Sequence, residues 1–291
     1  MWIWIGAAFA IVILLLGMEC MRELNMFQVR NCLVASEKLK NWKTEKRIVL
    51  LADLHCKVYG NDNDVLLQAV RDQKPDLILI AGDMLIGKNG CSPKEAIQFV
   101  SKLPEICPVY YGNGNHEQRM KEEPEKYGDV YQEYKKALGG SGVRFLENSY
   151  AELEMDGVSV EIHGIELPMP YYKKFKKHVL PLSMVERCLG SCDHSKYQIM
   201  ISHNPAFLDV MKQWGADLIV SGHLHGGIIR IPGLGGLITP QAKLFPKNSG
   251  GITISGNARY VVSRGLGTHT INLRLFNKAE IVTIHLRDRW I

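Results

Sequence analysis

The chain has 291 residues, of which 46% are hydrophobic and 22% charged, and its formal net charge at pH 7 is +5. This is the balance of an ordinary globular protein with ample material for a core. The small positive excess favours anionic partners such as phosphate groups or lipid headgroups and excludes a dedicated nucleic-acid-binding protein. The seven cysteines are scattered without a CxxC pair, which indicates free thiols in a reducing compartment rather than a zinc knuckle.

The N-terminal segment has the composition of a membrane span. Residues 2–18 form an uncharged stretch of about 17 residues, near the lower length limit for a spanning helix. A cleaved signal peptide is the alternative, but it requires positive charge before the apolar run and small residues after it, and the sequence has neither. We therefore expect residues 1–20 to be a transmembrane anchor that is not cleaved. Basic residues follow the span and none precedes it, which predicts a single-pass protein of the cell membrane with the rest of the chain in the cytoplasm.

The remainder is expected to be a polar, basic connector over residues 21–46 and one globular domain over residues 47–291. The first half of this domain alternates apolar runs, typical of buried strands, with segments of helical spacing. The expected strands are 47–52, 77–81 and 108–111, and the expected helices are 62–73, a helix that begins at Ser92 and Pro93, and a mostly exposed helix over about 118–138. This alternation is typical of stacked βα units.

The second half of the domain is richer in short strands and turns. Its expected elements are strands at 143–146, 151–155, 158–164, 197–201, 217–220, 260–263 and 280–286, a hairpin turn at Asp156-Gly157, a helix from Pro205 to about Trp214, and a loop over 226–256. Residues 168–196 are expected to be an insertion, and it contains the basic segment Lys173–Lys177. Two interpretations of this segment stay open: a solvated helix face, or a lid that contacts an anionic or lipid-bearing substrate.

Two histidines one residue apart, His223 and His225, follow the apolar run 217–220 and are flanked by glycines. Alternate side chains of an extended segment point the same way, so both rings can reach one point. The glycines permit the close approach of a metal or a substrate. Such a pair cannot hold a metal alone, so we expect further ligands from elsewhere in the chain.

Four other apolar runs end in the same way, with a turn that carries His, Asp or Asn. The residues of all five turns are Asp53 and His55, Asp83, Asn115 and His116, His203, and His223 and His225. Strand ends meet at one edge of the sheet in layered α/β proteins, and chemistry gathers there. Carboxylates, imidazoles and an amide oxygen are ligands for divalent first-row metals such as Mn, Fe or Zn. The pattern therefore predicts a metal site without thiolate ligands.

This series resembles the signature of the calcineurin-like metallophosphoesterase family, which is DxH, GD, GNH[DE], a lone His and GHxH in that order. The five blocks begin at Asp53, Gly82, Gly114, His203 and Gly222, and the resemblance extends over about residues 47–286. It implies an α/β fold, namely a four-layer αββα sandwich of two mixed β-sheets flanked by helices. It also implies a two-metal site at the strand ends.

The resemblance implies a role for each of these residues. The implied metal ligands form two sets that share one carboxylate: Asp53, His55 and His225 for one metal, Asn115, His203 and His223 for the other, and Asp83 as the bridge. A hydroxide that bridges the metals would attack phosphorus in line. His116 would be the catalytic group that stabilises the transition state or protonates the leaving oxygen. Glu117 either orients this region or is an ordinary surface residue.

Three local features bear on the substrate. After Gly82-Asp83 the sequence lacks the acidic and arginine residues of family members that act on phosphoproteins, which argues against a Ser/Thr protein phosphatase. The glycine expected soon after DxH arrives only at Gly60. Residues 263–267 resemble an element of the membrane-associated bacterial branch, where some relatives hydrolyse the pyrophosphate of UDP-diacylglucosamine. Arg264 in this segment either holds a phosphate or is a turn charge.

We therefore expect a membrane-anchored phosphohydrolase that uses two divalent metal ions (Mn, Fe or Zn) to cleave a phosphodiester or pyrophosphate bond. Lipid-linked phosphate compounds are among the candidate substrates, and the N-terminal helix makes the membrane an expected partner. One alternative is a phosphodiesterase or phosphomonoesterase for soluble or cyclic nucleotides. Another is a non-catalytic scaffold of the same fold, but a scaffold would be expected to lose metal ligands or the GNH histidine, and all are present.

Overall fold

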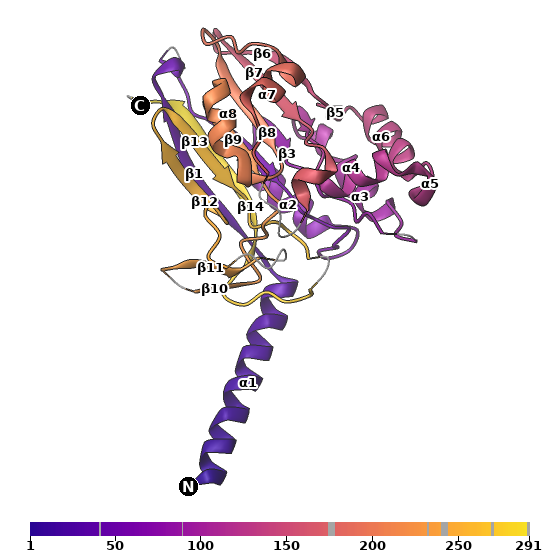
Figure 1. The fold of residues 1–291 in the computed structure, drawn as a ribbon, viewed down its shortest axis with the longest axis vertical. Coiled ribbons are helices and arrows are strands. Elements are labelled where there is room, and N and C mark those ends of the chain that lie inside the picture. Colours follow the sequence, from indigo (N-terminus) through magenta and orange to yellow (C-terminus); the bar gives the residue numbers. More distant parts are fainter. Residues whose placement is uncertain are drawn as a thin grey trace.

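The computed structural model describes residues 1–40, 42–88, 90–173, 178–231, 233–239, 244–268 and 271–289. Two six-stranded mixed sheets stack on each other, and helices cover their outer faces (Figure 1). The expected four-layer αββα arrangement is thereby confirmed. The long helix α1 (Trp2–Asn25) projects from one end of this sandwich.

The first sheet contains the strands that carry the DxH, GD and GNH blocks. Its order is β1 (Phe27–Ser36), β14 (Ala279–Asp288), β2 (Lys46–Leu51), β3 (Leu77–Ile80), β4 (Val109–Tyr111) and β5 (Arg144–Phe145). Strands β2, β3, β4 and β5 are parallel, while β14 runs antiparallel to β2 and parallel to β1. The carboxyl ends of β2, β3 and β4 therefore meet at one edge. Helices α2 (Asp64–Asp72) and α3 (Lys94–Val100) connect these three strands.

The second sheet contains the strands that carry the last two blocks. Its order is β12 (Gly251–Ser255), β13 (Ala258–Val262), β9 (Leu218–Ser221), β8 (Tyr197–Ser202), β7 (Val158–Ile165) and β6 (Ser149–Met155). Its four central strands are parallel, and an antiparallel hairpin closes each edge. Helices α7 (Leu182–Leu189) and α8 (Leu208–Trp214) pack on its outer face.

Successive side chains of a strand point to opposite faces of its sheet, which explains how each sheet packs against both neighbouring layers. In β2, Ile48 and Leu50 lie in the core between the sheets, whereas Val49 and Leu51 lie in the core beneath the helices. All four are fully buried. Successive side chains point to opposite faces of a sheet, so a strand covered on both faces is apolar throughout. This is why the run reads as continuously hydrophobic.

The structure corrects the expected connector over residues 21–46. Helix α1 continues to Asn25, and β1 begins at Phe27 and pairs with β14 over its full length of 10 residues. Cys32 and Val34 are buried in the core between the sheets. The prediction was wrong because polar and apolar residues do not alternate regularly along this edge strand, and its partner lies about 250 positions away in the sequence.

The segment after the GNH block also differs from expectation. Instead of one mostly exposed helix there are three helices, α4 (Asn115–Glu122), α5 (Pro124–Tyr127) and α6 (Val130–Gly140). Proline cannot continue a helix, so Pro124 starts a new one. Tyr127, Tyr131 and Tyr134 recur at helical spacing and are buried beneath the first sheet.

Two further expectations are refined. The segment 226–256, expected as a loop, contains β12 and the two-stranded sheet of β10 (Ile229–Ile231) and β11 (Gly235–Ile238). The expected insertion 168–196 contains a short 3-10 turn (Met169–Tyr172) and α7. Of its basic segment only Lys173 falls in the described part of the chain, so the two interpretations of Lys173–Lys177 stay untested because residues 174–177 lie outside the described residues.

Candidate metal centre

The five predicted blocks converge at the edge where the parallel strands end. Three groups of side chains have ligand atoms that all lie within 4.8 Å of one another, and every member is buried: Asp53, His55 and His225; Asp83, His203 and His223; and His55, Asp83 and His116. These residues come from both sheets and from positions up to about 170 residues apart. The meeting of the two sheets at this edge therefore assembles the site.

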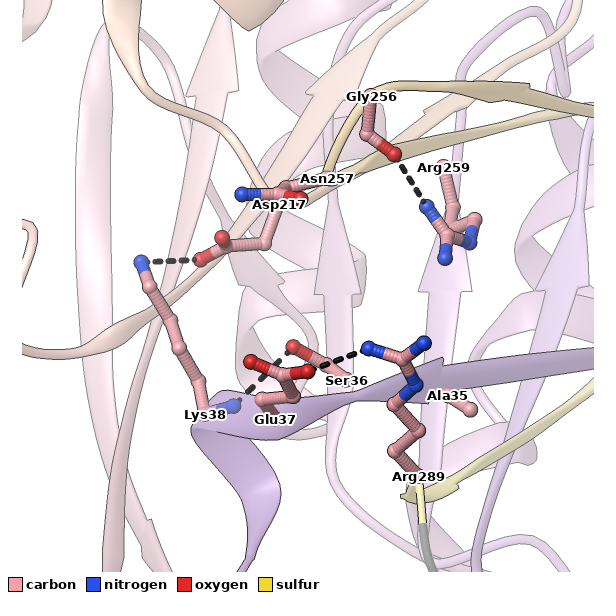
Figure 2. A pocket seen from close by; sticks show the side chains of 9 residues that line it. All are labelled: Ala35, Ser36, Glu37, Lys38, Asp217, Gly256, Asn257, Arg259 and Arg289. Carbon is pink, nitrogen blue, oxygen red and sulfur yellow. Dashed lines mark hydrogen bonds and ion pairs between the residues drawn. The ribbon is translucent and has the colours of Figure 1, made fainter.

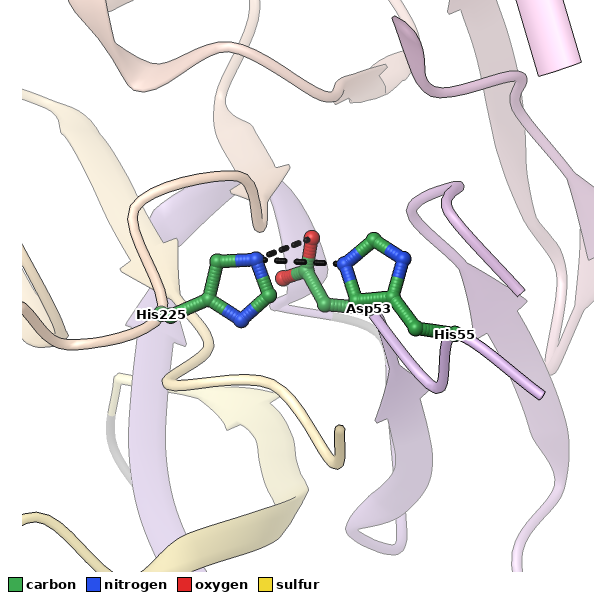
Figure 3. A group of neighbouring side chains, drawn as sticks. All are labelled: Asp53, His55 and His225. Atoms are coloured by element: carbon green, nitrogen blue, oxygen red, sulfur yellow. Dashed lines mark hydrogen bonds and ion pairs between the residues drawn. The ribbon is translucent and has the colours of Figure 1, made fainter. Parts of the chain in front are cut away.

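The first group joins the DxH and GHxH blocks (Figure 3). His55 Nε2 and His225 Nε2 lie 3.2 Å apart, and His225 Nε2 lies 3.8 Å from Asp53 Oδ1. The two rings flank the carboxylate of Asp53 in Figure 3. The arrangement aims two imidazole nitrogens and a carboxylate oxygen at a common point, which suits one divalent cation.

The second group contains Asp83, His203 and His223. His203 Nε2 lies 3.1 Å from Asp83 Oδ2. Close to this group, the side-chain Oδ1 of Asn115 is buried and has no hydrogen-bond partner among the residues that the structure describes. A buried amide oxygen without a partner is costly, and a divalent cation bound beside it would satisfy it.

The carboxylate of Asp53 links the two groups. The backbone N–H of His223 donates to both carboxylate oxygens of Asp53, at 3.0 Å each. His203 Nε2 lies 3.9 Å from Asp53 Oδ1 as well as near Asp83. The two groups therefore form one continuous centre with a carboxylate on either side.

Backbone carbonyls orient three of the histidines. Nδ1 of His55 lies 3.2 Å from Leu85 O, Nδ1 of His203 lies 2.5 Å from Ala81 O, and Nδ1 of His225 lies 3.1 Å from Gly267 O. A carbonyl oxygen can only accept a hydrogen bond, so each Nδ1 carries the hydrogen and the neutral ring has its lone pair on Nε2. This is the usual arrangement of histidine ligands to metals.

His116 has the opposite arrangement. Its Nδ1 accepts a hydrogen bond from the backbone N–H of Gly87 at 2.8 Å, so in the neutral ring Nε2 carries the hydrogen. That Nε2 lies 4.0 Å from Asp83 Oδ2. Burial lowers the pKa of His116 while the charge of Asp83 acts to raise it. The ring therefore presents an N–H donor to the centre instead of a lone pair.

Glu117 is fully buried and ties two of the blocks together. Its carboxylate accepts hydrogen bonds from the backbone N–H groups of Asp83 (2.8 Å), Gly114 (3.0 Å) and Leu85 (3.2 Å). It also accepts one from the hydroxyl of Tyr111 at 2.8 Å. This burial excludes the interpretation of Glu117 as an ordinary surface residue and leaves the one in which it orients the region. Glu117 holds the GD turn against the start of α4.

The centre concentrates buried charge. Burial raises the pKa of Asp53 to about 7, with His203 acting to lower it and Asp83 to raise it. Burial acts to lower the pKa of His203, but the Asp83 carboxylate raises it to about 9. Two fully buried carboxylates this close need positive charge to stay ionised. The chemistry of the donor set therefore fits divalent cations.

The backbone is strained at the candidate ligands. Asp53, His55, Asp83, His223 and His225 have φ values of 52°, 50°, 56°, 72° and 51°, in the left-handed region that residues other than glycine rarely adopt. Strain of this kind persists where the surrounding structure holds it, and it clusters at functional sites. Glycines provide the space: a Cβ at Gly114 would lie 2.1 Å from Asp83 Oδ1.

Two residues that the sequence analysis missed support the GHxH loop. Arg274 is buried and donates to the carbonyls of Gly265 (3.2 Å) and Gly267 (2.9 Å), and Gly267 O in turn contacts His225. Asn277 Nδ2 donates to the carbonyl of His225 at 2.7 Å. Both act on backbone atoms, so no local sequence pattern marks them.

Arg264 lies beside this loop and outside the two ligand groups. Its backbone N–H donates to Glu280 Oε1 at 2.9 Å, and its side-chain Nε lies 3.6 Å from Glu280 Oε2. A phosphate-binding role for Arg264 stays a prediction.

A pocket of about 400 Å³ lies at the opposite end of the strands from this centre (Figure 2). Asp217 precedes β9, whereas His223 follows it, so the strand separates the two sites. In the pocket Lys38 Nζ pairs with Asp217 Oδ2 at 2.8 Å, and Arg259 donates to Gly256 O at 3.0 Å. Because it lies at the other end of β9, the pocket is a feature separate from the metal centre.

The sequence profile of the calcineurin-like phosphoesterase family matches residues 46–227. The chain belongs to this family. As a calcineurin-like phosphoesterase it is a metal-dependent hydrolase of phosphoric esters, with two divalent metal ions as its cofactors. The predicted family, fold and enzyme class are thus confirmed.

Curated relatives cover most of this phosphoesterase. It is 27% identical to the uncharacterized protein YpbG of Bacillus subtilis, over 81% of this chain and 80% of that protein. It is 28% identical to the uncharacterized metallophosphoesterase YkoQ of the same organism, over 82% of each. It is 24% identical to the phosphodiesterase YaeI of Escherichia coli, again over 82% of each. Among solved structures, the phosphopantetheinyl hydrolase PptH of Mycobacterium tuberculosis aligns with a TM-score of 0.49 and 15% identity, over 80% of this chain and 96% of that one.

Proposed function

We propose that this phosphoesterase is a membrane-anchored two-metal enzyme that cleaves a phosphodiester or pyrophosphate bond, with lipid-linked phosphate compounds as its substrate class. The observation that carries the proposal is the contrast between the histidine rings. Backbone carbonyls set three rings so that, when neutral, each presents a lone pair on Nε2, and His116 is set by a backbone N–H to present a donor. A centre that has both cation ligands and a proton donor fits hydrolysis of a phosphate ester.

The proposed ligand sets are those expected from the sequence. They are Asp53, His55 and His225 for one cation, Asn115, His203 and His223 for the other, and Asp83 between them. The nitrogen and oxygen donors suit Mn, Fe or Zn. When bound, such cations polarise phosphate oxygens and lower the pKa of coordinated water.

The chain's own groups complete the chemistry. His116 donates the hydrogen on Nε2 to the phosphate or to the leaving oxygen, and the N–H of Gly87 keeps the ring in that orientation. Glu117 keeps Asp83 in place through its backbone N–H. We assign Arg264 to the phosphate of the substrate, because it flanks the GHxH loop next to Gly226.

Helix α1 supports the membrane part of the proposal. It has 24 residues and is the one helix in the described part of the chain that is long and apolar enough to cross a membrane. Its apolar side chains are exposed along its length. The basic residue Arg22 lies on the domain side of the span, which favours a cytoplasmic domain. Other basic residues after the span, such as Arg30, belong to the folded domain and say less about orientation.

An activity screen of the purified full-length protein tests the proposal. The protein is stripped with chelator, reloaded with Mn²⁺, Fe²⁺ or Zn²⁺, and assayed on bis(p-nitrophenyl) phosphate, p-nitrophenyl phosphate, a nucleoside diphosphate sugar and a lipid pyrophosphate in vesicles. Hydrolysis of diester or pyrophosphate that requires metal supports the proposal. Turnover of the monoester alone, with any metal, contradicts it.

A further inference from the structure

Five apolar side chains are exposed on three segments that follow the GHxH block in the sequence. We call them the apolar rim: Leu234 (73% exposed), Leu244 (66%), Phe245 (60%), Ile271 (49%) and Phe276 (47%). They come from the turn between β10 and β11, from the chain after β11 and from the loop that precedes β14. Large apolar side chains exposed together on one face mark an interaction site.

Backbone contacts make the rim continuous. The N–H of Phe245 donates to Leu237 O in β11 at 2.9 Å. On the other side of the small sheet, the N–H of Arg230 in β10 donates to Leu275 O at 3.0 Å. The three segments are thus joined through β10 and β11.

The rim lies where α1 enters the domain. Figure 1 shows α1 leaving the sandwich at the end that carries β10 and β11. The backbone N–H of Asn277, next to Phe276, donates to Glu23 Oε2 of α1 at 2.7 Å, and Glu23 is buried. Lys57, two residues after His55, donates to Leu24 O at 2.6 Å. With only Met26 between α1 and β1, the end of the helix is fixed to the domain.

The attachment of α1 to the domain sets the distance between the apolar rim and the bilayer. The uncharged part of α1, residues 2–18, is about 25 Å long at ~1.5 Å per residue, close to the hydrocarbon thickness of a bilayer. The first charges, Glu19 and Arg22, are paired with each other at 2.6 Å and mark the level of the headgroups. From there to Asn25 the helix rises only about 9 Å. With α1 across the bilayer, Phe276, which lies next to Asn277 and hence to Glu23, would lie close to the membrane surface.

The chemistry of the rim suits that position. Phe245 and Phe276 have φ values of 43° and 54°, an unusual conformation for a bulky residue, at turns that hold their rings out from the domain. The exposed Lys247 and the partly exposed Lys278 flank them. Apolar side chains with flanking lysines are typical of surfaces that enter the headgroup region.

We propose that the apolar rim inserts into the lipid–water interface of the bilayer that α1 spans, so that the edge of the sandwich with the metal centre faces the membrane. This inference rests on the membrane anchoring in the proposed function and adds a second, independent membrane contact. Asn277 links the two, because it contacts Glu23 through its backbone and the carbonyl of His225 through its side chain. A phosphate at headgroup level then reaches the centre while its lipid stays in the bilayer.

Tryptophan quenching in full-length protein tests the proposal. Trp2 and Trp4 are first replaced by Phe, and Phe276→Trp is then added. The protein is placed in vesicles of phosphatidylcholine and phosphatidylglycerol brominated near the top of the acyl chains. Interfacial side chains lie roughly 5–10 Å deep, so we expect about a twofold loss of the emission that Phe276→Trp adds. The matched control is Leu33→Trp, an exposed position (52%) on β1 about 20 Å along the strand from α1.

The possible outcomes distinguish membrane insertion of the apolar rim from membrane insertion of α1 and from catalytic activity. Quenching of Phe276→Trp with none for Leu33→Trp supports the rim. Equal emission of both in brominated and unbrominated vesicles overturns it. Quenching of the native Trp2 and Trp4 reports separately whether α1 enters the bilayer, and hydrolysis of bis(p-nitrophenyl) phosphate reports the proposed function. If the double variant Phe245→Glu/Phe276→Glu retains the soluble activity but has at least about tenfold less turnover of a vesicle-borne substrate, the rim is further supported.

Discussion

The backbone N–H of Gly87 donates a hydrogen bond to Nδ1 of His116 at 2.8 Å. This contact sets His116 apart from His55, His203 and His225, whose Nδ1 atoms face carbonyl oxygens. A residue in the turn after the GD block thus determines which nitrogen of the GNH histidine carries the hydrogen.

We predict that His116→Ala keeps both metal ions and loses most turnover. Removal of a positioned proton donor typically costs about 10²–10⁴-fold in rate. Metal content measured by plasma mass spectrometry, together with kcat on bis(p-nitrophenyl) phosphate, checks this. His116→Gln, which retains a donor N–H, should recover part of the rate. A loss of metal as large as that of a ligand variant would contradict the assignment.

His223→Ala is expected to lose one metal ion and the activity together. The substitution removes a ring of the second group, and the cation there would keep fewer protein ligands. Chelator should abolish the activity of the wild type. Added Mn²⁺ should restore the activity of the wild type, whereas the same concentration should not activate His223→Ala. A His223→Ala protein with wild-type metal content would show that His223 is not a ligand.

We expect Glu117→Ala to destabilise the fold by roughly 3 kcal/mol, because it leaves the buried N–H groups of Asp83 and Gly114 without acceptors. For a domain of this size the melting temperature should fall by about 6–12 °C. Thermal unfolding with chelator present measures the effect apart from metal binding. The control is Glu154→Gln, an exposed carboxylate on β6, which should leave the melting temperature unchanged. Equal melting temperatures for both variants would show that the hydrogen bonds of Glu117 to Asp83 and Gly114 do not stabilise the fold.

The sequence predicted the parts of the site that depend on a local pattern, namely turns that follow apolar strands. Strand ends at Asp53, Asp83 and His203 follow fully buried apolar runs, and such runs are recognisable without knowledge of their partners. The two-sheet architecture followed from the resemblance carried by the same turns. The roles of the individual ligands stay predictions that the variants above test.

Features that depend on distant partners were not predictable. Strand β1 lacks regular alternation of polar and apolar residues, since Arg30 and Asn31 are consecutive, and it becomes a strand by pairing with β14. Its sequence therefore looked like a connector. Arg274 holds the 265–267 turn through carbonyl oxygens, which every residue has. The burial of Glu117 was also not predictable, because its partners Tyr111, Asp83 and Gly114 surround it only in the folded protein.

The contact between Asn277 and the GHxH loop leads to the last prediction. Asn277 Nδ2 donates to the carbonyls of His225 and Gly227, and its removal frees the loop that carries the two proposed ligands His223 and His225. Loss of a hydrogen bond that supports a ligand typically weakens metal affinity about 10–100-fold. Asn277→Ala should therefore bind the more weakly held Mn²⁺ about 10-fold less tightly in a calorimetric titration, with kcat recovered at saturating metal. The matched control Asn257→Ala alters an exposed asparagine in the pocket at the far end of the strands and should bind metal like the wild type. Wild-type metal affinity in Asn277→Ala would mean that Arg274 and Gly267 hold His225 without help from Asn277.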